Sequence, residues 1–192
     1  MSPGGRKTAA TLGCCWLLLA LALPAAQAVA IDSQASHVVF TLKTRWGQRL
    51  EGYFPDVTGA VERTGDAQSR VRLRLPTGGV EILGHPRYTR LTRGEGFFDA
   101  VHHPQVEFVS DPHPDQLVRA GGKLGGVLTI RGVRRREVLD VAPAACGRPG
   151  IDCDVVVHGV VYRSDYAMDR WAIALSDRVE LVLRLRVRDG DG

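Results

Sequence analysis

The chain has 192 residues, of which 44% are hydrophobic, 24% charged and 6% aromatic. This composition is typical of one ordinary globular domain and argues against a disordered or fibrous protein. Basic residues outnumber acidic ones by 25 to 21, which would suggest nucleic-acid binding only if the basic residues were clustered. Whether the excess of basic residues indicates a nucleic-acid partner therefore depends on how they are distributed along the chain.

Residues 1–28 have the three-part pattern of a secretory signal peptide. A basic head at Arg6 and Lys7 precedes an apolar core, which ends at Pro24 and a run of small residues. We predict a cleaved signal peptide over residues 1–28, with cleavage before Val29, and hence an exported protein without a transmembrane anchor. The alternative is an uncleaved anchor, but the apolar core is shorter than the roughly 18 residues that a membrane span requires.

The predicted cleavage changes the charge and the cysteine count. Arg6 and Lys7 leave with no acidic residue, so the net charge of residues 29–192 falls to +2. We treat Cys14 and Cys15 as signal-peptide residues, because a lipidated cysteine would follow the apolar core rather than begin it.

The hydrophobic pattern beyond Val29 has a period of two, which indicates strands with one buried face. For example, Val71, Leu73 and Leu75 alternate with arginines. Glycines at 65, 78–79, 121–122 and 132 predict turns, and residues 85–93 are expected to form a short helix or lid that begins near Pro86. The strands expected in chain order are 38–43, 48–54, 57–62, 70–75, 105–108, 123–131, 133–141, 154–162 and 179–187. Short antiparallel strands of this number predict an all-β sandwich or barrel.

Most of the arginines alternate with aliphatic residues along these strands, which is typical of a solvated outer face. A single-strand nucleic-acid binder would need basic residues interleaved with stacking aromatic residues. The one run, Arg134 to Arg136, is followed by Glu137 and predicts a charged edge or turn. We therefore expect no nucleic-acid partner.

Cys146 and Cys153 bracket a turn that contains Pro149 and Gly150. In an oxidising compartment, two cysteines so placed favour a disulfide that closes a short loop. The alternative is a redox-active pair, whose usual form has two intervening residues at a helix start.

Several segments, in order, resemble the YceI-like lipid- and polyisoprenoid-binding family of exported bacterial proteins. The most specific stretch is Gly96-Phe97-Phe98-Asp99-Ala100 followed by His103-Pro104-Gln105-Val106-Glu107-Phe108. The other similar segments are Ile31–Phe40, Glu51–Gly59, Leu124–Val133, Arg163–Met168 and Trp171–Val187. Three positions depart from the family pattern: His103 replaces a common tyrosine, Arg131 a common histidine and Ala167 a usual glycine.

The resemblance implies that residues 29–192 form one YceI-like domain of the periplasm. Its expected fold is an extended, eight-stranded, antiparallel, lipocalin-like β-barrel that holds a long-chain amphiphile, such as a polyisoprenoid or an isoprenoid quinone. No cofactor is required; the bound group expected is a polyprenyl lipid or quinone. A barrel of this size has room for side chains or one slim ligand. The residues expected to line it are Val38, Phe40, Leu42, Leu73, Phe97, Phe98, Val106, Phe108, Leu128, Ile130, Trp171, Leu183 and Leu185.

Two alternatives stay open beside this binding or carrier function. The first is a structural or stress-protective barrel that is filled by its own side chains, since buried aliphatic residues need no functional explanation. The second is a metal-dependent enzyme that uses the His102/His103 region, although adjacent side chains on a strand point to opposite faces. No nucleophile elbow, phosphate loop or dinucleotide motif occurs in the sequence, so we expect no enzyme. The oligomeric state is also open, with a homodimer as the alternative to a monomer.

Overall fold

The computed structural model describes Met1 and residues 28–188. The predicted signal peptide, including Cys14 and Cys15, lies outside these residues except for its first and last positions. The elements in chain order are β1 (Ala28–Ala30), β2 (His37–Thr44), β3 (Arg49–Phe54), β4 (Thr58–Gly65), β5 (Gln68–Pro76), the 3-10 turn η1 (Thr77–Gly79), β6 (Glu81–Ile82), α1 (Pro86–Arg93), β7 (Gln105–Ser110), β8 (His113–Pro114), α2 (Leu117–Ala120), β9 (Gly122–Ile130), β10 (Val133–Val141), β11 (Val155–Tyr162), the 3-10 turn η2 (Arg163–Tyr166) and β12 (Leu175–Leu185).

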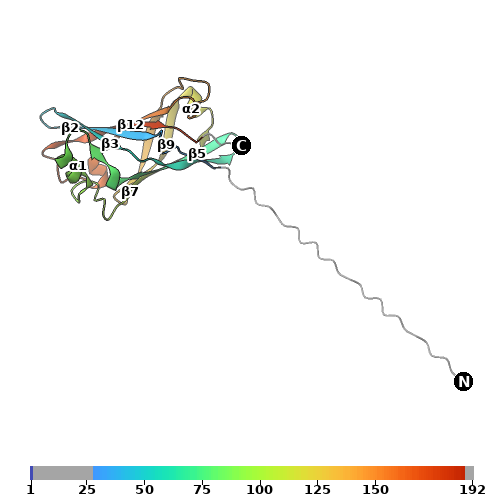
Figure 1. Ribbon diagram of the computed structural model, residues 1–192, viewed down its shortest axis with the longest axis horizontal. Helices are drawn as coiled ribbons and strands as arrows, with labels where there is room; N and C mark the ends of the chain where they lie inside the picture. The colour runs from blue at the N-terminus through green and yellow to red at the C-terminus, as the bar shows by residue number, and fades with distance from the viewer. Residues whose placement is uncertain (2–27, 189–192) are drawn as a thin grey trace.

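The strands form one curled, antiparallel, twelve-stranded sheet (Figure 1), in the order β1-β4-β5-β7-β9-β10-β11-β12-β2-β3-β6, with β8 paired to β5. All nine strands that the alternation predicts are present, and the all-β class is confirmed. The expected count of eight strands is wrong. The three strands without a predicted counterpart, β1, β6 and β8, have only two or three residues, too few to show an alternating pattern.

The sheet curls into a half-barrel whose seam is bridged at one end by the two ends of the described chain. Ile31 pairs with Val187, and the Ile31 N–H donates to the carbonyl of Gly59, 2.9 Å away. The Arg188 N–H donates to the carbonyl of Ala30, also at 2.9 Å. The segment after β1 therefore lies between β4 and the extension of β12, and it closes this end of the barrel.

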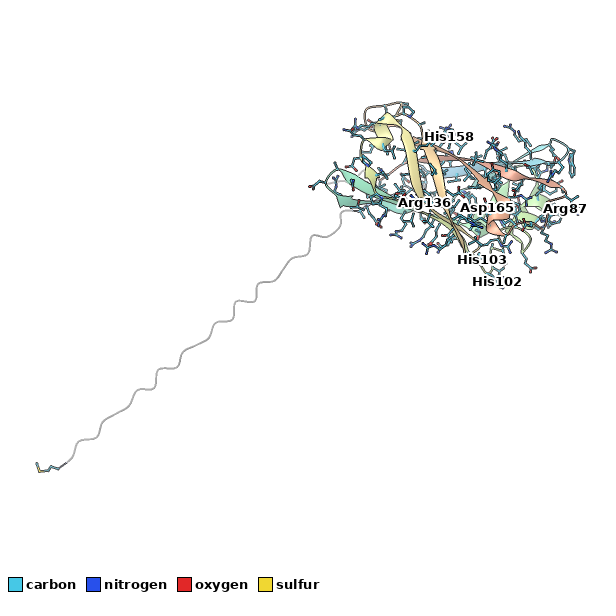
Figure 2. The ribbon with its side chains drawn as sticks, turned by 180° about the vertical axis from the view of Figure 1, so that it is seen from behind. Arg87, His102, His103, Arg136, His158 and Asp165 are labelled. Carbon is cyan, nitrogen blue, oxygen red and sulfur yellow. A yellow bond between two sulfur atoms is a disulfide. The ribbon has the colours of Figure 1, made fainter. Side chains whose placement is uncertain are left out.

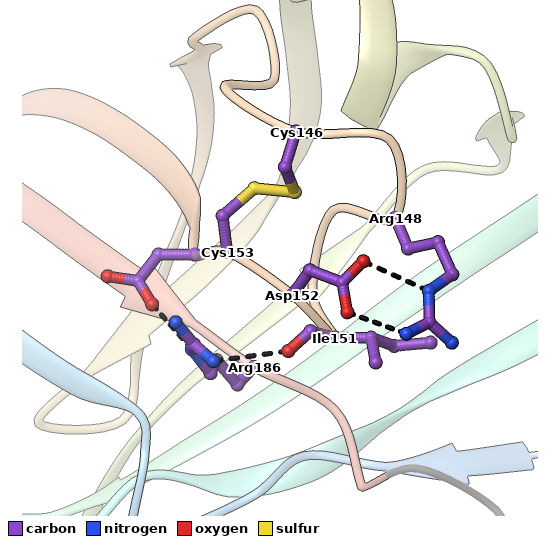
Figure 3. The surroundings of a disulfide bond; sticks show 7 residues. Cys146, Arg148, Ile151, Asp152, Cys153 and Arg186 are labelled. Carbon is purple, nitrogen blue, oxygen red and sulfur yellow. Dashed lines mark hydrogen bonds and ion pairs between the residues drawn. A yellow bond between two sulfur atoms is a disulfide. The ribbon is translucent and has the colours of Figure 1, made fainter.

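A disulfide between Cys146 and Cys153 stabilises the same end of the barrel, which confirms the predicted pairing. Within the closed loop, Arg148 makes two hydrogen bonds to the carboxylate of Asp152 (Figure 3). Arg186 donates to the carbonyl of Ile151 at 3.1 Å and so holds the loop against the chain beyond β12. The disulfide loop thereby packs on the closed seam.

The core forms because alternate residues of the strands point into the curl, and two glycines make room for its aromatic rings. Gly52 lies opposite Phe40 in the β2–β3 pairing, and a β-carbon at Gly52 would lie only 2.0 Å from the Phe40 ring. A β-carbon at Gly126 would lie 2.6 Å from the Phe108 ring. Glycine within a strand thus allows close approach of neighbouring groups, here two phenylalanine rings and, at Gly126, also the backbone carbonyl of Val109.

Helix α1 covers the other end of the barrel, and its bounds agree with the predicted residues 85–93. Pro86 occupies its first turn, where a missing N–H costs nothing, and Gly94 follows its last residue. The side chain of Thr89 accepts a hydrogen bond from the Ile82 N–H at 2.8 Å, and Arg93 Nε donates to the carbonyl of Val80 at 2.8 Å. These bonds tie α1 to β6 and to the residue before it. The four-residue helix α2 is not among the elements predicted from the sequence.

Candidate ligand-binding interior

The curled sheet encloses a central cavity of about 70 Å³ whose lining is apolar apart from one arginine. Ten of the thirteen residues predicted to face the interior line it: Val38, Phe40, Leu73, Phe97, Phe98, Val106, Phe108, Leu128, Ile130 and Leu183. The strand alternation therefore brings residues from five strands, β2, β5, β7, β9 and β12, together around one space, beside Phe97 and Phe98 from the loop after α1. That they contact a ligand stays a prediction.

The remaining three predicted residues line two flanking cavities. Leu42 and Trp171 line a cavity of about 160 Å³ beneath α1, which we call the mouth because Trp46, Tyr88 and other exposed side chains border it. Leu185 lines a cavity of about 40 Å³ at the α2 end.

The three cavities share walls and form one series along the barrel. Within the part of the chain that the structure describes, Phe97 is the single residue that lines both the mouth and the central cavity. The central cavity shares Leu73, Phe108, Leu139 and Leu183 with the cavity at the α2 end. Because neighbouring cavities have these residues in common, movement of a few side chains would join them into one apolar channel.

Aromatic rings occupy much of the space inside the curled sheet, around the central cavity. All five phenylalanines of the chain are buried. The ring centroids of Phe40 and Phe54 lie 5.7 Å apart, those of Phe54 and Phe98 5.5 Å, and those of Phe97 and Phe98 5.1 Å. These separations and the tilted or edge-on ring planes are favourable for aromatic pairs. The interior is therefore stabilised as it stands, with only a small volume left open.

The loop after α1 directs Phe97 and Phe98 inward. The Phe97 N–H donates to the carbonyl of Gly94 and the Phe98 N–H to that of Thr92, both at 3.0 Å. Asp99 then turns the chain with a positive φ of 50°, and its carboxylate hydrogen-bonds His102 Nδ1 at 2.9 Å. This hydrogen bond lowers the pKa of the Asp99 carboxyl. The turn after the two phenylalanines is thus fixed by backbone and side-chain bonds.

Among the described residues, Arg163 is the one charged residue that lines the central cavity, and it is 1% exposed. Its guanidinium donates to the backbone carbonyls of Met168 at 2.6 Å, Ser176 at 3.0 Å and Leu175 at 3.4 Å. Burial lowers the pKa of Arg163, while Asp177 and Asp169 oppose that shift. Three carbonyls therefore hold a buried cation whose two remaining N–H groups have no partner among the described residues.

The η2 turn places Arg163 at this position. The backbone N–H and hydroxyl of Ser164 both donate to the Asp177 carboxylate, at 2.8 and 2.7 Å. Burial raises the pKa of Asp177, but these bonds and the Arg163 cation outweigh it, so the pKa is lowered overall. The buried hydroxyl of Tyr166 donates to Glu137 at 2.7 Å, and burial is the main cause of a raised pKa for this phenol. The turn is therefore anchored to β12 and to β10.

A second buried polar side chain lies at the far end of the series. His113 is 7% exposed and lines the cavity at the α2 end. Its Nδ1 lies 3.3 Å from the Pro114 carbonyl, whereas its Nε2 is buried without a hydrogen-bond partner among the described residues.

Sequence reasoning did not identify several residues of the central cavity, including Phe54, Leu139, Met168 and Arg163. Phe54 continues the alternation of Leu50 and Gly52, so the strand pattern contains the signal for it. Arg163 and Met168 lie in a turn and the loop after it, where periodicity gives no direction. Only their place in the segment that resembles the YceI-like family marks them.

The histidines considered as a metal site in the sequence do not lie together as a set of ligands in the structure. No group of three or more His, Cys, Asp or Glu side chains among Met1 and residues 28–188 could hold a metal ion. His102 bonds Asp99, and both His102 and His103 lie at the edge of the molecule in Figure 2. Within the same residues, no helix is long and apolar enough to cross a membrane.

The fold resembles that of three proteins of known structure. BcnA of Burkholderia cenocepacia is 23% identical, with a TM-score of 0.65 over 83% of this chain and 99% of BcnA. A polyisoprenoid-binding domain of Saccharophagus degradans, implicated in plant cell wall breakdown, is 14% identical, with a TM-score of 0.63 over 84% of this chain and 97% of the domain. The YceI protein of Campylobacter jejuni is 22% identical, with a TM-score of 0.55 over 72% of this chain and 84% of that protein.

No curated protein sequence matches this chain. Residues 30–187, however, match the YceI-like domain, a match that covers almost all of the sequence beyond the predicted signal peptide. The chain therefore belongs to the YceI-like family.

Proposed function

We propose that this protein binds the tail of a long-chain amphiphile, such as a polyisoprenoid or an isoprenoid quinone, and carries or sequesters it in the periplasm. The observation that carries the proposal is the series of apolar cavities, which share walls from the mouth to the α2 end. A flexible apolar chain gains about 25 cal/mol for each Å² that it removes from water. The polyisoprenoid-binding domain with the same fold supports a ligand of this class.

Binding of such a chain requires side chains to move. The central cavity of about 70 Å³ is far below the roughly 300 Å³ at which ordinary ligand pockets begin. Phe97 and Phe98 are the natural side chains to move, because they come from a loop rather than from a strand. Their displacement would join the mouth to the central cavity and free the volume that the rings occupy.

Arg163 would provide a polar contact for the head of the ligand once Phe97 moves aside. It lies against Phe97, the residue that divides the mouth from the central cavity. A phosphate or a quinone carbonyl at this boundary would accept hydrogen bonds from the two N–H groups of Arg163 that no carbonyl uses. The head would then lie at the boundary and the tail in the interior.

The filled barrel is the second candidate function, and the dense phenylalanine cluster favours it. In that case the rings are permanent core, and the protein has a structural or stress-protective function without a ligand. The two candidates differ in whether the interior accepts a chain at all.

Tryptophan fluorescence separates the two candidates. Trp46 and Trp171 both line the mouth, so a quinone head bound near them quenches their emission. We expect saturable quenching by a long-chain isoprenoid quinone and none by the same head group without its tail. The control is a Val138→Ser variant, which changes an exposed residue of β10. It should show the same saturable quenching by the long-chain quinone. Equal, unsaturable quenching by both quinones would contradict the proposal and favour the filled barrel.

A further inference from the structure

Three segments surround the mouth and form what we call the mouth rim: the turn Arg45–Gln48, helix α1 and the loop Asp169–Ala174. The Arg45 N–H donates to the carbonyl of Ala174 at 2.9 Å, and its Nε donates to that of Ala172 at 3.2 Å. Arg170 forms an ion pair with Glu95, which follows α1. The three segments are thus tied together, and Figure 1 shows α1 at one end of the molecule and α2 toward the other.

The mouth rim exposes large apolar side chains. Ile173 is 95% exposed and Trp46 is 70% exposed, although isolated residues of this kind on a surface are normal. Here they are not isolated, because Tyr88 and Leu91 of α1 are exposed beside the same cavity that Trp46 lines. Four apolar side chains of a connected rim therefore face water.

The same rim concentrates the positive charge of the molecule. It holds five arginines and one acidic residue, Asp169, while Glu95 just beside it pairs with Arg170. Because residues 29–192 as a whole have a net charge of only +2, the residues of this range outside the rim are net negative. Arg87 and Arg90 are exposed and make no ion pair among the described residues. Figure 2 shows Arg87 at the α1 end, away from His158.

We propose that the mouth rim docks on the surface of an anionic lipid bilayer. Arginines attract anionic head groups, and tryptophan and aliphatic side chains insert at the boundary between head groups and acyl chains. The docked rim would place the mouth directly against the membrane. This proposal concerns the outer surface and does not depend on what the interior holds, so it can fail or succeed separately from the proposed ligand binding.

Vesicle sedimentation with the purified, ligand-free protein tests the docking. The vesicles contain phosphatidylglycerol and phosphatidylcholine, or phosphatidylcholine alone. The first variant is Arg87→Gln/Arg90→Gln, and its matched control is Arg119→Gln/Arg188→Gln, with two exposed arginines away from the rim. A second pair changes an exposed aliphatic residue, Ile173→Ser on the rim and Val101→Ser away from it.

We expect binding to the anionic vesicles, weaker binding to phosphatidylcholine alone, and loss of affinity as the ionic strength rises. Each arginine near an anionic surface contributes roughly a factor of five, so the rim pair should weaken binding roughly twenty- to thirtyfold, and its control little. Ile173→Ser should also weaken it more than Val101→Ser. No vesicle binding would overturn the proposal, as would equal losses in the rim and control variants. Binding that is the same for both vesicle compositions would overturn it as well.

Discussion

The guanidinium carbon of Arg163 lies 5.8 Å from the centroid of the Phe97 ring. A cation so placed is attracted by the face of the ring, and here the two partners have different positions in the interior. Phe97 separates the mouth from the central cavity, whereas Arg163 is the buried charge of that cavity. A movement of Phe97 would therefore open the passage and uncover the cation at the same time.

Replacement of Phe97 by alanine should open the passage between the mouth and the central cavity. The matched control is Phe98→Ala, because Phe98 is equally buried but lines only the central cavity. Both variants should lose about 3–5 kcal/mol of stability, as is usual for a buried phenylalanine. Stopped-flow fluorescence should show faster quinone association and dissociation in Phe97→Ala alone. Equal acceleration in both variants would contradict a gate at Phe97.

Replacement of Arg163 by methionine should destabilise the fold although it removes a buried charge. The carbonyls of Met168, Leu175 and Ser176 would lose their donor, which costs about 2–4 kcal/mol by the usual penalty for unpaired buried groups. Urea denaturation of the variant measures the loss. An unchanged midpoint would mean that solvent or another donor satisfies these carbonyls.

Replacement of Gly52 by alanine should disturb the phenylalanine cluster. The new β-carbon would meet the Phe40 ring at 2.0 Å, and overpacking of this kind typically costs about 1–3 kcal/mol. Gly78→Ala is the control, since nothing lies within 4 Å of its β-carbon. Thermal unfolding should show a lower midpoint for Gly52→Ala than for Gly78→Ala, and equal midpoints would contradict the close packing.

Loss of the disulfide should weaken the closed end of the barrel. For a loop of this length, with a sequence separation of 7, the chain-entropy estimate gives about 2.5 kcal/mol. Cys146→Ser/Cys153→Ser should lower the free energy of unfolding by that amount. Hydrogen exchange should become faster at Val187, whose N–H donates to the carbonyl of Gly150 in the loop. Unchanged exchange there would show that the loop does not hold the seam.

The Asp99–His102 hydrogen bond should make a contribution to stability that depends on pH. It lowers the pKa of Asp99 in the folded protein, so the contribution is present above the ordinary carboxyl pKa and disappears as the pH falls through the folded value. In His102→Gln the pKa of Asp99 should rise toward its ordinary value. Carboxyl NMR titration measures it, and the same Asp99 pKa in both proteins would exclude this role for His102.

The strand pattern predicts the nine longer strands because each buries alternate residues of one face. It cannot predict β6 or β8, whose two residues pair at an edge or off the main path of the sheet. The strand pattern cannot predict the closed seam either, because the Ile31–Val187 pairing joins distant parts of the chain through their backbones. Local alternation indicates which residues face inward but not how the sheet ends meet.

The same distinction applies to the candidate site. Alternation predicts that Phe40, Leu73 and Phe108 face inward, because strands have a fixed period, and all three line the central cavity. It gives no direction for Arg163, which lies in a 3-10 turn and is held by carbonyls of other segments. The small open volume could not be predicted either, because it depends on the rotamers of several rings that meet from different elements.

Native mass spectrometry of the full-length protein purified from cells that produce it naturally is the most direct test of ligand binding in the interior. We expect a population heavier than the polypeptide, whose extra mass is released by organic solvent as a hydrophobic compound. We also expect stripped protein to take up an added polyprenyl lipid. Protein that is free of any adduct and also ignores added polyprenyl lipids would contradict the claim that this barrel binds a long-chain amphiphile.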